Sequence, residues 1–250
     1  MSANRAAEVP TEGGGDTTRI MALSDGLFAI VLTLLVLDLK PAPTASGHAY
    51  DALVELWPRL FAFFLTFLVG GSFWVSHHSD LETLRGYDRT CMWLNLMFLL
   101  PVSLLPFTTA LIGDNTGSVT WSLYAINVIA IGLTQTALWS YVRIVGFIEP
   151  THTRAELQFQ MVRHLTIPAV FALSVGVSFI LPGVAPYTAL LIPVVLRAYT
   201  RVAGWKEPSP PRPRAASLWR AVGFTPVAMF VIWSIWLGIH GQLSGGTAGP

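Results

Sequence analysis

Long apolar runs separated by short polar stretches dominate this chain. A helix that spans a bilayer needs about 20 mostly apolar residues, and seven segments approach that length. The sixth is short and contains Pro193, and a Pro-rich stretch separates it from the seventh. The pattern predicts an all-α, polytopic membrane protein. The predicted helices are 19–39, 56–77, 91–112, 119–142, 162–181, 184–200 and 217–240.

Composition supports the membrane assignment. Only 12% of the 250 residues are charged and 53% are hydrophobic, whereas a soluble domain carries about 25% charged residues. The single cysteine, Cys91, excludes an internal disulfide and any cysteine-based metal cluster. The first 18 residues are polar and contain Gly-Gly-Gly, so they read as a disordered tail rather than a signal peptide.

The same composition divides the chain into five parts. Six predicted helices form one transmembrane domain, and a linker rich in Pro and Arg leads to an additional helix. The parts are a disordered cytoplasmic tail 1–18, the six-helix domain 19–201, the linker 202–216, the additional transmembrane helix 217–240 and a disordered tail 241–250.

The basic residues predict the orientation in the cell membrane. With the N-terminus in the cytoplasm, 13 of the 15 Lys and Arg residues lie on the cytoplasmic side, and only Lys40 and Arg59 lie outside. This asymmetry follows the positive-inside rule. Seven spans would then place the C-terminus outside.

The first predicted helix has two different faces. At 100° per residue, five side chains fall within about 60° of one another: Arg19, Leu23, Ile30, Leu34 and Leu37. Thr33 flanks this stripe, and Asp25 lies far from it. Because an acid in a membrane helix nearly always faces protein or water, Asp25 is expected to face its own bundle. The stripe is then free to face lipid, another helix or a pore.

A second group of polar residues lies at the same predicted depth as Asp25. Trp74 shares a helix face with His77 and His78, three and four residues later, and Asn95 lies near the start of the third helix. These side chains could form one hydrogen-bonded cluster that fastens helices together. A catalytic or zinc-binding role is the alternative, although no HExxH-type pair is present.

Several motifs resemble one known family. Residues Arg19 to Asp25 read RIMALSD, which is similar to the RxxxFSD signature of the potassium channel transmembrane protein 175 and its prokaryotic relatives. The following SDGLFAIVLTLLVLDL continues the match, and FWVSHH, WLNLMFLL and LPFTT resemble the second and third helices of that family. The resemblance covers about residues 19–201.

The resemblance implies a homotetrameric channel for K⁺, and possibly other monovalent cations, in the lipid bilayer. Its subunit would have six helices and cytoplasmic termini, and the first helix would line the pore. Rings of Ile30, Leu34 and Leu37 would gate the pore and make it selective, with the Thr33 hydroxyl near the ions. The residues that would hold the pore helix in place are Arg19, Ser24, Asp25, Trp74, His77 and Asn95.

No enzymatic activity, cofactor, metal or nucleic-acid partner is expected from this resemblance. The chain departs from the family pattern at two places, because Leu23 replaces the signature Phe and the helix at 217–240 is additional.

Three other functions remain open from the residues alone. A proton-coupled secondary transporter could use Arg19, Asp25 and His77 as a relay. A membrane enzyme could use His77, His78 and Asp80. A non-conducting membrane scaffold could use the additional helix to bind a partner.

Overall fold

The computed structural model describes residues 17–40, 49–115, 117–150 and 153–203, with side chains from residue 56 onward in the second helix. The predicted linker from residue 204 onward and the predicted seventh helix, 217–240, lie outside these residues. The elements are α1 (Thr18–Leu34), the 3₁₀ helix η1 (Leu35–Asp38), α2 (Ala49–Glu82), α3 (Arg89–Ser103), α4 (Leu105–Asp114), α5 (Ser118–Val145), α6 (Arg154–Ile180), the 3₁₀ helix η2 (Ala185–Leu190) and α7 (Leu191–Val202).

Among the described residues, five helical segments are long and apolar enough to cross a membrane. This confirms the prediction of an all-α, multi-pass membrane protein. The segments are Thr18–Asp38, Leu56–Glu82, Arg89–Asp114, Ser118–Val145 and Arg154–Ile180. The sixth predicted helix is present as η2 followed by α7.

The first predicted helix is not α-helical throughout. The α-helix ends at Leu34, and η1 continues the chain to Asp38. A 3₁₀ helix turns by about 120° per residue rather than 100°, so the direction of Leu37 cannot be read from an α-helical wheel. In the structure, Leu35 is buried whereas Leu34 and Leu37 are exposed.

The third predicted helix, 91–112, is interrupted at Leu104, between α3 and α4. Pro106 has no N–H, so it cannot donate the α-helical bond to the carbonyl four residues earlier. Leu104 N instead bonds the Pro101 carbonyl at 3.2 Å, which tightens the chain at the joint. Two half-helices therefore share one membrane span.

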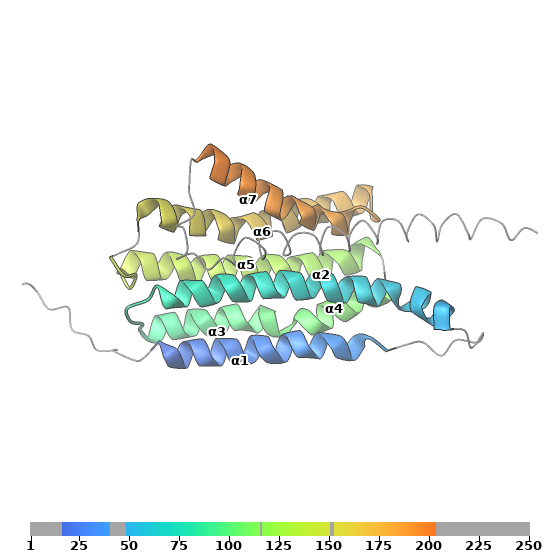
Figure 1. Ribbon diagram of the computed structural model, residues 1–250, viewed down its shortest axis with the longest axis horizontal. Helices are drawn as coiled ribbons and strands as arrows, with labels where there is room; N and C mark the ends of the chain where they lie inside the picture. The colour runs from blue at the N-terminus through green and yellow to red at the C-terminus, as the bar shows by residue number, and fades with distance from the viewer. Residues whose placement is uncertain (1–16, 41–48, 116, 151–152, 204–250) are drawn as a thin grey trace, which may run out of the picture. The chain divides into compact units, whose positions relative to one another are not determined.

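The helices run side by side, with α1 at one edge of the bundle and α7 at the other (Figure 1). α1 packs against α2 and α3, and α5 packs against α3, α4 and α6. The buried centre includes large side chains from α1, α3, α5 and α6, among them Phe28, Phe98, Tyr124 and Phe171. Among the described helices, one edge of α1 is thus left without a neighbour.

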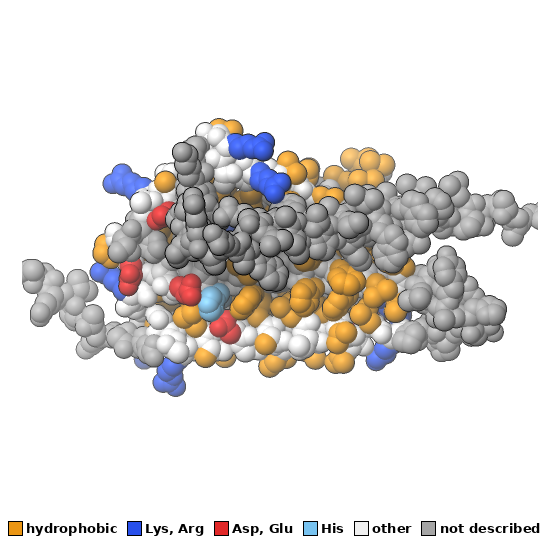
Figure 2. Space-filling model, viewed as in Figure 1, with side chains coloured by type: hydrophobic (Ala, Val, Ile, Leu, Met, Phe, Trp, Pro, Cys, Tyr) orange, Lys and Arg blue, Asp and Glu red, His pale blue; other side chains and the backbone are white. Residues whose placement is uncertain are grey.

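Basic side chains gather at the end of the bundle where α1 and α6 begin (Figure 2). Lys40 and Arg59 lie together at the opposite end, since Arg59 Nη1 donates to the Lys40 carbonyl at 3.1 Å. Among the described residues, the two predicted outer residues Lys40 and Arg59 therefore lie at the end of the bundle opposite to the starts of α1 and α6.

A glycine permits the close packing of α5 against α6. A Cβ atom at Gly132 would lie 2.7 Å from Cδ and 2.9 Å from Cγ of Pro168. Both atoms belong to a rigid ring inside α6, so neither can move away alone. The contact therefore requires a residue without a side chain.

We predict that Gly132→Ala lowers the stability of the purified protein by about 1–3 kcal/mol, because the added methyl group overpacks the α5–α6 contact. Thermal unfolding in detergent measures the effect. Gly176→Ala in α6 is the matched control, since a Cβ there meets nothing within 4 Å. Equal unfolding temperatures for the two variants would contradict the prediction.

Candidate functional site

α1 presents one face to the bundle and another to its outside. Phe28 and Val31 are at most 3% exposed, whereas Ile30 is 60%, Leu34 41% and Leu37 60% exposed. Leu23, where the family signature has Phe, is also half-exposed on this outer side. The stripe of Ile30, Leu34 and Leu37 therefore lies outside the core formed by the described residues.

Thr33 is exposed beside this stripe. Its hydroxyl lies 2.9 Å from the Ala29 carbonyl and 2.8 Å from the Ile30 carbonyl, so its proton is donated to its own helix. A hydroxyl that donates its proton inward keeps its oxygen lone pairs as acceptors. Thr33 can thus offer an oxygen, but no proton, to the space outside α1.

Asp25 is bound by side chains of α2. Trp74 Nε1 donates to Asp25 Oδ1 at 2.8 Å, and His78 Nδ1 lies 3.3 Å from the same oxygen. His78 Nε2 lies 3.4 Å from Glu82 Oε1 on the other side of its ring. The carboxylate of α1 is thereby tied to one face of α2.

Ser24 forms the adjoining buried contact between α1, α2 and α3. Asn95 Nδ2 donates to Ser24 Oγ at 3.2 Å, and His77 Nε2 lies 3.3 Å from the same oxygen. The His77 ring also packs on Phe98 of α3, with ring centroids 4.3 Å apart. We refer to the joined group as the Asp25 cluster: Ser24, Asp25, Trp74, His77, His78 and Asn95.

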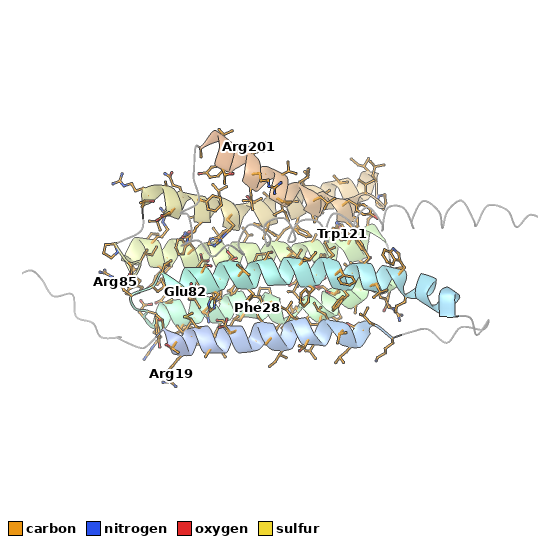
Figure 3. All side chains as sticks on the ribbon, in the orientation of Figure 1. Arg19, Phe28, Glu82, Arg85, Trp121 and Arg201 are labelled. Atoms are coloured by element: carbon orange, nitrogen blue, oxygen red, sulfur yellow. The ribbon has the colours of Figure 1, made fainter. Side chains whose placement is uncertain are left out.

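The structure distributes the two histidines differently from the sequence interpretation. The sequence predicts that His77, rather than His78, helps to hold the first helix. In the structure, His77 contacts Ser24, and His78 lies beside the Asp25 carboxylate. Adjacent helical residues point about 100° apart, so the two rings reach adjacent residues of α1. Arg19 is exposed and points away from the bundle (Figure 3), so within one subunit it is not a member of the cluster.

A second polar cluster fastens α2 to α5 and α6. Asp80 is buried, and its Oδ2 lies 2.8 Å from His164 Nε2 and 3.2 Å from Gln135 Nε2. Arg163 Nη2 lies 3.4 Å from Asp80 Oδ1. From the sequence, Asp80 is a candidate only for a membrane enzyme, and Gln135, Arg163 and His164 are not predicted as site residues. Polar and ionisable residues inside apolar segments were the signal that would have found them.

The polar contacts of these clusters are contacts between side chains of different helices. Among the described residues, no three His, Cys, Asp or Glu side chains are grouped so as to hold a metal ion. What the arrangement does is hold α1 against α2 and α3 while leaving the aliphatic face of α1 uncovered. The fold and this site together define a multi-pass membrane protein with a fixed first helix.

Comparison with known proteins identifies the family. The family model described as endosomal/lysosomal potassium channel TMEM175 matches residues 19–106. A potassium channel of Streptomyces collinus is 32% identical over 172 residues, which is 66% of this chain and 84% of that protein. The chain belongs to the TMEM175 family of potassium channels.

Two further similarities agree with this assignment. The crystal structure of a lysosomal potassium-selective channel TMEM175 homolog from Chamaesiphon minutus matches with a TM-score of 0.64 and 27% identity, over 74% of this chain and 97% of that one. The human endosomal/lysosomal proton channel TMEM175 is 25% identical over 80% of this chain, which spans 42% of the human protein.

We predict that Asn95→Ala lowers stability by about 0.5–2 kcal/mol, because it removes a hydrogen bond between helices and leaves the buried Ser24 and His77 with fewer partners. Thermal unfolding in detergent is the measurement. Ser103→Ala in the same helix is the control, since the Ser103 hydroxyl is exposed and bonds the Leu100 carbonyl of its own helix. If Ser103→Ala lowered the stability as much as Asn95→Ala, the role of Asn95 in joining α3 to α1 would be contradicted.

Proposed function

We propose that this protein is a potassium-permeable cation channel whose pore is lined by α1 of each subunit. The observation that supports the proposal best is the exposure of Ile30, Leu34 and Leu37 on the side of α1 that its own bundle leaves uncovered. Membership of a potassium channel family and similarity to a potassium-selective homolog support the same function. The permeant ions are K⁺ and, to a smaller extent, other monovalent cations.

The channel is a homotetramer in this proposal. Four copies of α1 surround one axis, and each exposed aliphatic stripe then faces the axis rather than lipid. The Asp25 cluster lies behind the pore helix and fixes its rotation, because Trp74 and His78 hold Asp25 while Asn95 and His77 hold Ser24. The basic end of the bundle faces the cytoplasm of the cell, as the positive-inside rule requires.

The gate consists of stacked rings of Ile30, Leu34 and Leu37. A narrow apolar constriction loses its water, and an ion cannot cross it without shedding its hydration shell. A slightly wider constriction passes a partly hydrated ion, so selectivity arises from size and dehydration cost. Thr33 supports this mechanism with an acceptor oxygen beside the rings, where a cation can replace part of its lost hydration.

The arrangement favours a channel over the proton relay of a coupled transporter. A relay through Arg19, Asp25 and His77 requires the three groups to be linked. In the structure His77 contacts Ser24, and Arg19 points out of the bundle.

We expect Ile30→Ala and Leu34→Ala each to raise K⁺ flux into liposomes and to lower the preference for K⁺ over Na⁺, because a smaller ring widens and wets the constriction. Asn at either position should have a larger effect. Ion flux through the purified, reconstituted protein is the measurement.

Leu133→Ala is the matched control, since Leu133 is a similarly exposed aliphatic residue (53%) on α5, away from the proposed pore. Its flux and selectivity should equal those of the unmodified protein. Unchanged conductance and selectivity in both Ile30 and Leu34 variants would refute the aliphatic gate.

Replacement of Asp25 tests the support of the pore helix. We expect Asp25→Ala to lose the tetramer or the folded protein, because Trp74 Nε1 and His78 lose their shared acceptor and α1 is free to rotate. Mass measurement in detergent reports the assembly. A well-folded tetramer with normal flux would show that the Asp25 contacts are dispensable.

A further inference from the structure

A cavity of about 190 Å³ lies at the end of the bundle opposite the Asp25 cluster, between η1, α2 and α4. Its floor is apolar and includes Leu35, Phe63 and Ala110, whereas Asp38, Lys40 and Arg59 line its polar side. Drug-sized ligands occupy pockets of about 300–1,000 Å³. A cavity of this size therefore suits a smaller group, such as a single polar headgroup.

Arg59 is held in place at this cavity. A Cβ at Gly113 would lie 3.3 Å from the Arg59 backbone, so glycine lets α2 approach α4 closely. Arg59 Nε donates to Asp114 Oδ1 at 2.9 Å, and Nη1 donates to the Lys40 carbonyl at 3.1 Å. A guanidinium has five N–H donors, so the contacts with described residues use two of them and leave three for a ligand. Guanidinium groups with free donors bind phosphate well.

The other charged groups of the cavity restrict the ligand further. Asp38 ends η1, and Lys40 follows two residues later. Asp114 also lines the cavity and pairs with Arg59. A simple anion that approaches Arg59 and Lys40 therefore meets the two carboxylates, and a simple cation that approaches Asp38 meets the two basic groups. A ligand that carries both a phosphate and an ammonium group can interact with charges of both signs.

An exposed apolar surface begins at the cavity. The Phe63 ring packs against the rings of Phe64 and Phe67, with centroids 5.1 and 5.9 Å apart. Phe64 and Phe67 are exposed on α2, and Figure 2 shows hydrophobic side chains gathered over this half of the helix. The apolar spans that contain α1 and α4 end at Asp38 and Asp114, which line this cavity. The cavity therefore lies at the depth of the lipid headgroups.

We propose that this cavity binds the headgroup of a phospholipid that carries a primary ammonium group, such as phosphatidylethanolamine. Arg59 and Lys40 bind the phosphate, Asp38 accepts hydrogen bonds from the ammonium group, and the acyl chains lie along Phe64 and Phe67. The site involves the outer end of the bundle alone, so it does not depend on the proposed pore.

Native mass spectrometry of the delipidated full-length protein tests the proposal. Dioleoyl phosphatidylethanolamine, phosphatidylcholine and phosphatidylglycerol are added separately, and retained lipid is counted. We expect phosphatidylethanolamine to be retained most strongly, because phosphatidylglycerol lacks the cation and the choline group cannot donate a hydrogen bond to Asp38. Lys40→Ala and Asp38→Asn should each weaken its binding about tenfold.

Arg154→Ala is the control, since Arg154 is an exposed cation at the opposite end of the bundle. It should retain phosphatidylethanolamine as the unmodified protein does. Equal retention of the three lipids, or unchanged binding in both cavity variants, would overturn the proposal. Free ethanolamine phosphate should compete only weakly, and displacement at the concentration of the lipid itself would assign the site to a soluble zwitterion instead.

Discussion

The hydrogen bond from Trp74 to Asp25 is the constraint on which the arrangement of the first helix depends. A carboxylate within an apolar helix is costly unless polar groups surround it. The polar groups that contact Asp25 come from Trp74 and His78 of α2. The face of α1 that carries Asp25 must therefore be turned toward α2. Fixing Asp25 therefore fixes the rotation of α1, and the side chains on its other face are turned outward.

The rest of the bundle supports this constraint from behind. Ser24 makes the adjacent contact with Asn95 and His77, so α3 joins the same attachment. Asp80 follows His77 by three residues on α2 and contacts His164 of α6 and Gln135 of α5. The polar residues at this end thus connect the first helix to the most distant long helix.

Polar side chains hold α1 in place, whereas its exposed face is aliphatic. This difference explains why aliphatic residues form the proposed gate. Polar groups in a membrane protein bind one another, so the residues that look reactive in the sequence serve as attachments. Ile30, Leu34 and Leu37 have no such partners and remain exposed in the subunit. In the proposed channel, four copies of the chain bring these stripes together around the pore.

Among the described residues, the sequence determined where the long membrane helices lie, because apolar runs of membrane length act locally. It also determined that Asp25 and the aliphatic stripe face different ways, since both lie on one helix of known period. The tertiary structure decided which histidine meets Asp25, because that depends on how α2 is rotated against α1. It also decided the partners of Asp80, the 3₁₀ turn at Leu37 and the cavity beside Arg59. Each of these depends on contacts between segments far apart in the chain, which no local pattern specifies.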